Sequence, residues 1–146
     1  MGRFATGITV ATTRVGEQLF GMTANAVTSL SLDPPLILLC VDKRAQFLAA
    51  LKESAIFALS ILTEEHEAIS RRFAQKGPKD FSDLHPITAI TGAPILPDAL
   101  AWVDCKVADV LPGGDHEIFL GEIQDGDCRD GRPLLYFSGN YATLSS

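Results

Sequence analysis

Short runs of apolar and β-branched residues alternate with turn residues along this chain, which is typical of an antiparallel β protein. Strands are expected over residues 7–14, 18–30 (as the hairpin return of the first), 36–41, 56–62, 103–107, 116–123 and 134–137. Residues 36–41 are apolar throughout, which indicates a strand that is buried. Phe119, Trp102 and Phe137 are expected in the core. Tight turns between most neighbouring strands favour a barrel over a parallel sheet.

Two segments carry helical periodicity instead. Residues 45–53 place three apolar side chains on one face, and residues 63–76 form the clearer helix. In the second segment Thr63 can act as N-cap, acidic residues fill the first turn and basic residues the last. Ile69 and Phe73, four residues apart, form its apolar stripe, and Gly-Pro follows as a stop signal.

Composition narrows the possible functions. The 146 residues have the length of one domain, and 12 Lys and Arg against 18 Asp and Glu give a net charge of −6. This balance argues against nucleic-acid partners and provides no polybasic patch for a membrane surface. No signal peptide or membrane-spanning run is evident, so a cytoplasmic location is expected. Three cysteines without a Cys-x-x-Cys pair are expected to be reduced thiols.

Several catalytic signatures are missing from the sequence. It contains no G-x-G-x-x-G dinucleotide turn, no phosphate-binding P-loop and no G-x-S-x-G nucleophile elbow. The three histidines are dispersed without metal-ligand spacing. Neither a metal site nor a catalytic side chain is therefore predicted.

Residues 21–31 form the most unusual local feature, because small and hydroxyl-bearing side chains are concentrated just before a Pro-Pro turn. Small side chains would let a flat ligand approach the backbone, while Thr, Asn and Ser would add donors and acceptors. A Thr/Ser-rich edge strand would have the same composition. The residues alone leave both interpretations open.

Motifs spread along the chain resemble the flavin reductase-like, FMN-binding split-barrel family. They lie at residues 7–10, 21–25, 29–35, 72–74, 79–81, 114–122 and 133–137. The likeness covers about residues 4–141 in the family's order, and it is closest to the reductase components of two-component aromatic monooxygenases. Each motif is weak alone, and together they make a strong pattern.

The resemblance implies one domain over residues 1–146, mainly β with short helices, folded as a six-stranded antiparallel Greek-key split β-barrel. It implies a homodimer that binds FMN or FAD and takes hydride from NADH, with NADPH left open. Reduced flavin would then diffuse to a separate oxygenase component. Such a reaction depends on positioning and on stabilising developing charge, so a chain without an evident acid or base suits it.

By position in the motifs, the resemblance also implies site residues. Those expected to bind flavin are Thr23, Ala24, Asn25, Ala26, Ser29, Ser31, Asp42, Lys43, Arg44, Ala74, Lys79 and Phe81. Ala45 and Gln46 stand where relatives more often carry serines. His116 and Tyr141 are expected beside the nicotinamide, and Asn140 replaces an arginine that many relatives carry before this tyrosine. Spacing alone favours an exposed turn residue without a role for His116, and the motif around it favours the nicotinamide site.

Two other functions remain possible on the same barrel. One is an electron carrier or redox sensor that binds flavin without a nicotinamide site; His116 after Gly-Gly-Asp favours the reductase over it. The other is an oxidase of the pyridoxamine-phosphate type, which would need a basic set for the substrate phosphate that this acidic chain does not display.

Overall fold

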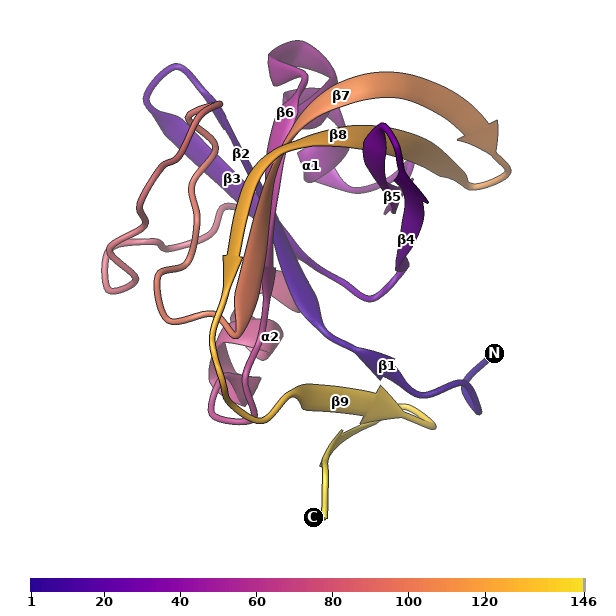
Figure 1. Cartoon of the computed structure of the whole chain (residues 1–146), viewed down its shortest axis with the longest axis vertical. Coiled ribbons are helices and arrows are strands. Elements are labelled where there is room, and N and C mark those ends of the chain that lie inside the picture. Colours follow the sequence, from indigo (N-terminus) through magenta and orange to yellow (C-terminus); the bar gives the residue numbers. More distant parts are fainter. Residues whose placement is uncertain (146) are drawn as a thin grey trace.

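Ten strands form two antiparallel sheets in the computed structural model, which describes residues 1–145 (Figure 1). The main sheet has the order β3-β2-β6-β7-β8-β5-β4. Its strands are β2 (Thr9–Val15), β3 (Gln18–Ala24), β4 (Val27–Leu32), β5 (Pro35–Asp42), β6 (Ile56–Ile61), β7 (Ala101–Gly113) and β8 (His116–Cys128). The small sheet joins β1 (Thr6–Gly7), β9 (Leu134–Phe137) and β10 (Asn140–Thr143), and the helices are α1 (Gln46–Ser54) and α2 (Glu67–Ala74).

The main sheet curls without closing, because the consecutive strands β3 and β4 lie at its two opposite ends. Neighbours that are not consecutive, β2 with β6 and β8 with β5, give the Greek-key connectivity. The expected mainly β split-barrel architecture is therefore confirmed. The sheet has seven strands where six were expected.

The extra strand arises from residues 18–30, which are not one hairpin return. β2 begins at Thr9, and Thr9 faces Ala24 in the ladder, so the backbone after Ala24 has no further partner on β2. The chain crosses to the other end of the sheet, where Val27 of β4 pairs with Leu39 of β5. The segment is therefore divided into two strands that pair with different partners, β2 and β5. The local sequence pattern does not encode this change of partner.

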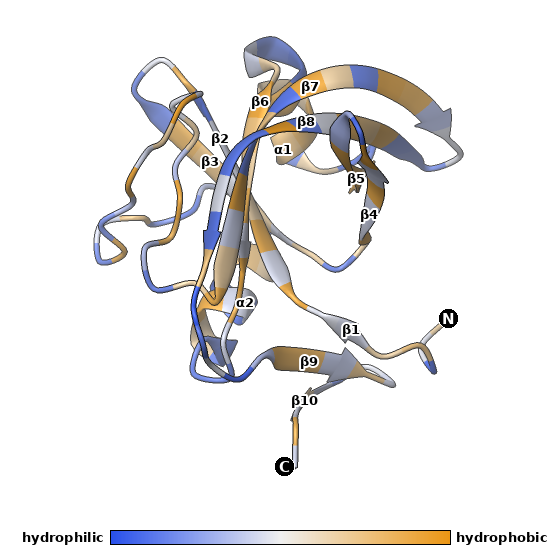
Figure 2. Ribbon diagram, in the orientation of Figure 1, coloured by the Kyte–Doolittle hydropathy of each residue, from blue (hydrophilic) through white to orange (hydrophobic). Residues whose placement is uncertain are grey.

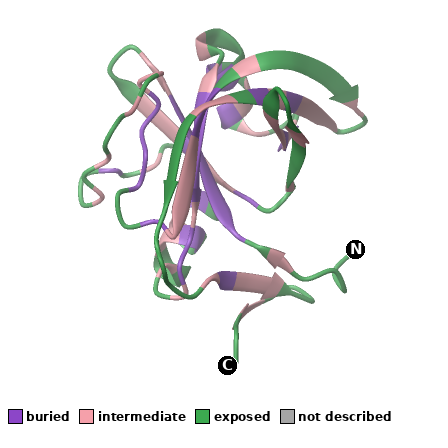
Figure 3. Ribbon diagram, in the orientation of Figure 1, coloured by how far each residue is buried: buried purple, intermediate pink, exposed green. Residues whose placement is uncertain are grey.

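The main core lies between the central strands of the main sheet and α1. Phe57, Leu59 and Phe119 are at most 1% exposed and pack with Phe47 of the helix. Gly121 permits this packing, since a Cβ there would lie 2.4 Å from the Phe57 ring. Apolar colour recurs on β6 and β5 in Figure 2. Buried positions lie along the central strands in Figure 3, whereas β4 and the tip of the β7–β8 hairpin are exposed.

Helix α2 is shorter than residues 63–76, so the predicted boundaries were wrong. Thr63 forms a bridge with Pro133, and its hydroxyl accepts a bond from the Glu65 backbone N–H in a turn before the helix. The N-cap position belongs to His66, without a side-chain capping bond. The expected apolar stripe is confirmed, because Phe73 is 1% exposed and Ile69 packs against the same cluster.

Strands β7 and β8 extend well beyond the predicted ranges and form the long arched hairpin of Figure 1. The strand expected over residues 116–123 continues to Cys128, which pairs with Ala101. Two bulges in this ladder, at Asp104/Cys105 and at Val107/Asp109, bend the hairpin over the barrel.

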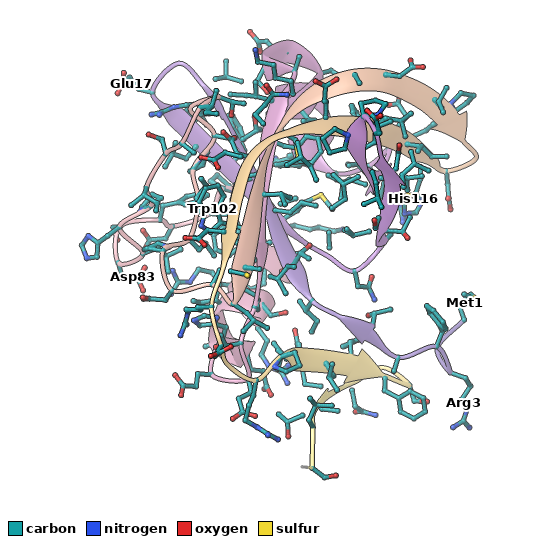
Figure 4. The ribbon with its side chains drawn as sticks, viewed as in Figure 1. Met1, Arg3, Glu17, Asp83, Trp102 and His116 are labelled. Atoms are coloured by element: carbon teal, nitrogen blue, oxygen red, sulfur yellow. The ribbon has the colours of Figure 1, made fainter. Side chains whose placement is uncertain are left out.

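Two of the aromatic side chains expected in the core lie elsewhere. Phe119 is fully buried, but Trp102 is half-buried beside a small satellite cluster (Figure 4), and Phe137 is 40% exposed. β5 also departs from expectation, since Leu39 and Val41 are buried while Leu38, on the opposite face, is half-buried. Alternation along these strands leaves one side of each outside the core.

The loop between α2 and β7 is anchored to the sheet by a buried carboxylate. Asp104, 0% exposed, accepts bonds from the backbone N–H groups of Ile90 and Thr91, both at 2.8 Å, and from the Thr91 hydroxyl at 2.5 Å. Each oxygen is thereby satisfied inside the protein. Neither described helix is long and apolar enough to cross a membrane.

Candidate functional site

A cleft of about 940 Å³ lies between β3, α2 and the start of α1. Nearly the whole of β3 contributes to its lining, together with α2, the segment that follows α2 and two residues of the small sheet. Five separate parts of the sequence contribute to its lining: residue 8, residues 18–23 and 25, residues 42 and 44–47, residues 70 and 73–79, and residues 136 and 141. The curl of the sheet and the docking of α2 create this concave surface.

The close contact of α2 with β3 forms one wall. Gly21 has no side chain, and a Cβ there would lie 2.6 Å from a Phe73 ring carbon, so the helix can approach the strand closely. Thr23 donates its hydroxyl to the Ser70 backbone oxygen at 2.6 Å. Asn25 follows at the strand end, where its exposed amide donates to the Thr6 hydroxyl at 3.3 Å.

Three cationic side chains line the cleft: Arg44, Lys76 and Lys79. Arg44 forms a two-point bond with the Asp42 carboxylate, and this bond holds the pKa of Asp42 well below its usual range. Lys79 donates to the backbone oxygens of Gln75 and Gly77, and its partial burial lowers the pKa of its ammonium group. Within an acidic chain, these side chains concentrate positive charge at one cleft.

Two tyrosines from the small sheet form the opposite wall. Tyr136 and Tyr141 meet edge to face, with ring centroids 5.5 Å apart. The Tyr141 hydroxyl is 2.7 Å from the hydroxyl of Ser70, which is fully buried in α2. Arg71 lies over the other side of the Tyr141 ring, 4.7 Å from its centroid. These contacts fix Tyr141 in place against the helix.

His116 lies outside the lining of the cleft but close to its cationic rim. His116, which is labelled in Figure 4, is the first residue of β8 and pairs directly with Asp42, the last residue of β5. Its Nδ1 is 2.7 Å from an Asp115 carboxylate oxygen, and this bond lowers the pKa of Asp115. The same bond orients the imidazole, leaving Nε2 as the ring nitrogen turned away from Asp115.

The described residues contain no group of His, Cys, Asp and Glu that could hold a metal ion. None of the three thiols lines the cleft, and burial raises the pKa of Cys105 to about 12. A protonated, buried thiol is inert as a nucleophile. The lining of the cleft presents cations, hydroxyl groups and aromatic rings, which are groups that can bind and orient a ligand.

Comparison with known proteins gives this geometry its context. The family model described as "Flavin reductase like domain" matches residues 1–145. The chain belongs to the flavin reductase-like family. It is 40% identical, over 99% of its length and 92% of the relative's, to the reductase component of 4-hydroxyphenylacetate 3-monooxygenase from Thermus thermophilus.

Two further relatives support the family assignment. An NADH-dependent flavin reductase of a Rhodococcus species is 37% identical over 99% of this chain and 82% of that protein. The structure of the flavin reductase PheA2 superposes with a TM-score of 0.93 at 38% identity, covering 100% of this chain and 94% of that one. Both sequence and backbone thus agree with the family over the whole domain.

Half of the site residues suggested by the family motifs line the cleft. These are Thr23, Asn25, Asp42, Arg44, Ala74, Lys79 and Tyr141. The others lie outside the lining, namely Ala24, Ala26, Ser29, Ser31, Lys43, Phe81 and His116. Ala24 is buried beneath the surface, and Phe81 packs edge to face on Phe73 in the core, with ring centroids 5.1 Å apart.

Sequence reasoning missed several lining residues, among them Gln18, Ser70, Lys76 and Tyr136. Tyr136 lies within the 133–137 motif, which gave a signal for its segment though not for its role. Ser70 and Lys76 carry no local signal, because their relevance follows only from the docking of α2 on β3.

The residues present fit a bound flavin. A cleft of about 940 Å³ is within the range of small-molecule sites, roughly 300–1,000 Å³. The side chains of Thr23 and Asn25 offer hydrogen-bonding groups to the edge of a flat ring system, and the three cations suit a phosphate.

Proposed function

We propose that this flavin reductase-like protein transfers hydride from NADH to FMN or FAD and supplies the reduced flavin, by diffusion, to a partner monooxygenase. The observation that carries the proposal is the cationic, aromatic-walled cleft in a chain that belongs to this family throughout its length. Relatives named as NADH-dependent flavin reductase and as reductase components of monooxygenases support the choice of substrates and of partner. A cytoplasmic location accords with this role.

The bound flavin would supply the chemistry by accepting hydride from NADH. The protein's own residues would bind the flavin and NADH and orient them toward each other. Thr23 and Asn25 would border the ring system and ribityl chain, and Arg44, Lys76 and Lys79 would hold the phosphate. Because these charges and dipoles are fixed before reaction, they would stabilise developing negative charge without a proton donor.

His116 would contact the nicotinamide. Asp115 fixes the ring at 2.7 Å, and the position of His116 opposite Asp42 places it at the rim of the flavin cleft. An oriented imidazole at this rim can hydrogen-bond a carboxamide or pack on the nicotinamide ring. It need not exchange a proton during hydride transfer.

The homodimer belongs to the same proposal. Cross-strand pairs put Leu38 beside Leu120 and Cys40 beside Ile118 on the outer face of β5 and β8. All four side chains are only half-buried, so the face is apolar and open to solvent. Asp42 and His116, the next pair along, share this face. A second copy covering it would bring its own surface to the rim of the cleft and complete the nicotinamide site.

Sedimentation equilibrium at micromolar protein, with flavin present, tests the dimer. We expect a mass of about twice the chain mass of 15.7 kDa. A monomer mass would contradict this part of the proposal and would leave the outer face of β5 and β8 unexplained.

The activity is tested by following NADH and NADPH oxidation with FMN, FAD and riboflavin added in turn. We expect flavin-dependent oxidation that is faster with NADH. A protein that binds flavin but oxidises neither nicotinamide would be an electron carrier or redox sensor instead, and the reductase proposal would fail.

A further inference from the structure

The segment that follows α2 supplies one side of the cleft and two of its three cations. Residues 75–79 all line the cleft, and Lys76 and Lys79 are among them. The segment has no helix or strand of its own, and Gly77 bends it with a left-handed φ of 94°. The position of both ammonium groups therefore depends on how the two ends of the segment are held.

One end of the segment is α2 itself, and the other end returns to this helix through Arg72. The Arg72 guanidinium forms a two-point bond with the Asp83 carboxylate, at 2.7 and 2.9 Å. It also donates to the Asp80 backbone oxygen at 3.0 Å. Asp83 is labelled in Figure 4, on the loop between α2 and β7. These bonds join one residue of the helix to two residues of the loop, and they close the segment between them.

An apolar contact closes the same loop from the inside. Phe81 is 9% exposed and packs edge to face on Phe73, with ring centroids 5.1 Å apart. The ion pair lies on the outer side, where the side chain of Arg72 is 31% exposed and that of Asp83 is 58% exposed. Substitutions in the ion pair leave the aromatic contact in place. They should therefore loosen the segment without unfolding α2.

The ammonium of Lys79 is tied to the shape of this segment. It donates to the backbone oxygens of Gln75 at 2.5 Å and Gly77 at 2.6 Å, which leaves one of its three donors for a ligand. Because Lys79 directly precedes the residue that Arg72 bonds through the backbone, a shift of that end would move the ammonium. Neither Arg72 nor Asp83 lines the cleft, so neither contacts a ligand held there.

We infer that Arg72 is a positioning residue for the flavin phosphate. Its two-point bond to Asp83 holds residues 75–79, and with them the two lysines, in place for the phosphate of FMN or FAD. The inference rests on the proposed function, which assigns that phosphate to the cations of the cleft. It goes further by making the affinity for the phosphate depend on an ion pair outside the cleft.

Flavin fluorescence titrations with FMN and with riboflavin test the inference, because riboflavin has the same ring system and lacks the phosphate. Arg72→Gln should raise the dissociation constant for FMN by about three- to five-fold, the upper range for an exposed ion pair. The constant for riboflavin should stay within about two-fold of wild type. Lys79→Gln, which removes a cation of the cleft itself, is the reference and should shift the FMN-to-riboflavin ratio in the same direction.

Asp83→Asn separates positioning from charge. Removing this carboxylate makes the surroundings of the cleft more positive, so an effect of charge alone would tighten FMN binding. Loss of positioning should weaken FMN binding, as in Arg72→Gln. Arg72→Lys keeps the charge without the planar donor pair and should weaken it as well. Combining Arg72→Gln with Asp83→Asn should be no worse than Arg72→Gln alone, because both changes break the same contact.

Lys52→Gln is the matched control. Lys52 forms an ion pair of the same length, 2.7 Å, with Glu117, and neither residue lines the cleft. The substitution removes one positive charge, as Arg72→Gln does, and should leave both flavin constants unchanged.

The inference is overturned if Arg72→Gln changes the FMN and riboflavin constants by the same factor or changes neither, or if Asp83→Asn tightens FMN binding. If Lys79→Gln shifted the ratio and Arg72→Gln did not, the phosphate site would stand and the positioning role would fail. The titrations use no nicotinamide and need no turnover, so this result is separable from a failure of the proposed reductase activity.

Discussion

Asp104 and Asn25 are both polar residues on the barrel, but their surroundings differ. Asp104 is 0% exposed and accepts three hydrogen bonds from residues 90 and 91. Asn25 is exposed, and its amide makes a 3.3 Å bond to Thr6 at the edge of the cleft. The carboxylate of Asp104 is thus satisfied by the protein itself, whereas the amide of Asn25 keeps hydrogen-bonding capacity for a ligand in the cleft.

This difference separates stability from function. Buried groups that are fully bonded stabilise one arrangement of the chain, and removing a partner leaves donors unsatisfied. Half-exposed groups at the cleft contribute little to folding, since water satisfies them when no ligand is present. Substitutions on the two sides should therefore change different measured quantities.

Asp104→Ala should release the loop that Asp104 anchors to the sheet, and it should give the largest free-energy change of the substitutions considered. It leaves the backbone N–H groups of Ile90 and Thr91 without their acceptor, so we expect a loss of about 2–4 kcal/mol in the free energy of unfolding. Urea denaturation measures it. Asp104→Asn keeps the size and one acceptor oxygen and should lose less than half as much. An unfolding free energy unchanged in Asp104→Ala would show that the anchored loop contributes nothing to stability.

His116→Ala should affect the nicotinamide side of the site and leave the fold intact. The loss of one well-placed contact is worth roughly 1–3 kcal/mol, so kcat/KM for NADH should fall about five- to hundred-fold. Flavin affinity should stay close to wild type. Steady-state kinetics measure kcat/KM for NADH, and a flavin titration measures flavin affinity.

His85→Asn serves as the control for His116. His85 is exposed on the loop before β7, and asparagine tolerates its left-handed backbone, with φ of 48°. Its kinetic constants should remain within two-fold of wild type. If flavin binding fell together with NADH kinetics in His116→Ala, the imidazole would belong to the flavin site; if neither moved, the nicotinamide assignment would be wrong.

Asn25→Leu should give the smallest free-energy change. It tests the cleft half of the comparison between Asp104 and Asn25. It adds bulk and removes an amide at the cleft, so flavin affinity should fall tenfold or more, about 1.4 kcal/mol. Unfolding free energy should change little, because the side chain is exposed. Asn25→Ala separates loss of the amide from added bulk. An unaltered flavin titration in folded Asn25→Leu would remove residue 25 from the site.

Local pattern by itself determined much of this protein. Alternation and turn residues predicted β2, β5, β6 and β9 to within two residues at either end, and the Ile69–Phe73 spacing identified the buried face of α2. The motifs identified the family and brought seven cleft residues into the prediction. These features are local, because periodicity and turn chemistry act over a few neighbouring residues.

The tertiary structure decided the rest. The segment after Ala24 leaves β2 and pairs with β5 because β2 begins at Thr9, opposite Ala24. The sequence of residues 18–30 contains no information on where β2 begins. Lys76 and Tyr136 reach the same cleft only because α2 docks against β3 and the small sheet contacts α2 through Tyr141. Strand register and helix docking are set by contacts between residues distant in sequence, and such contacts exist only in the assembled core.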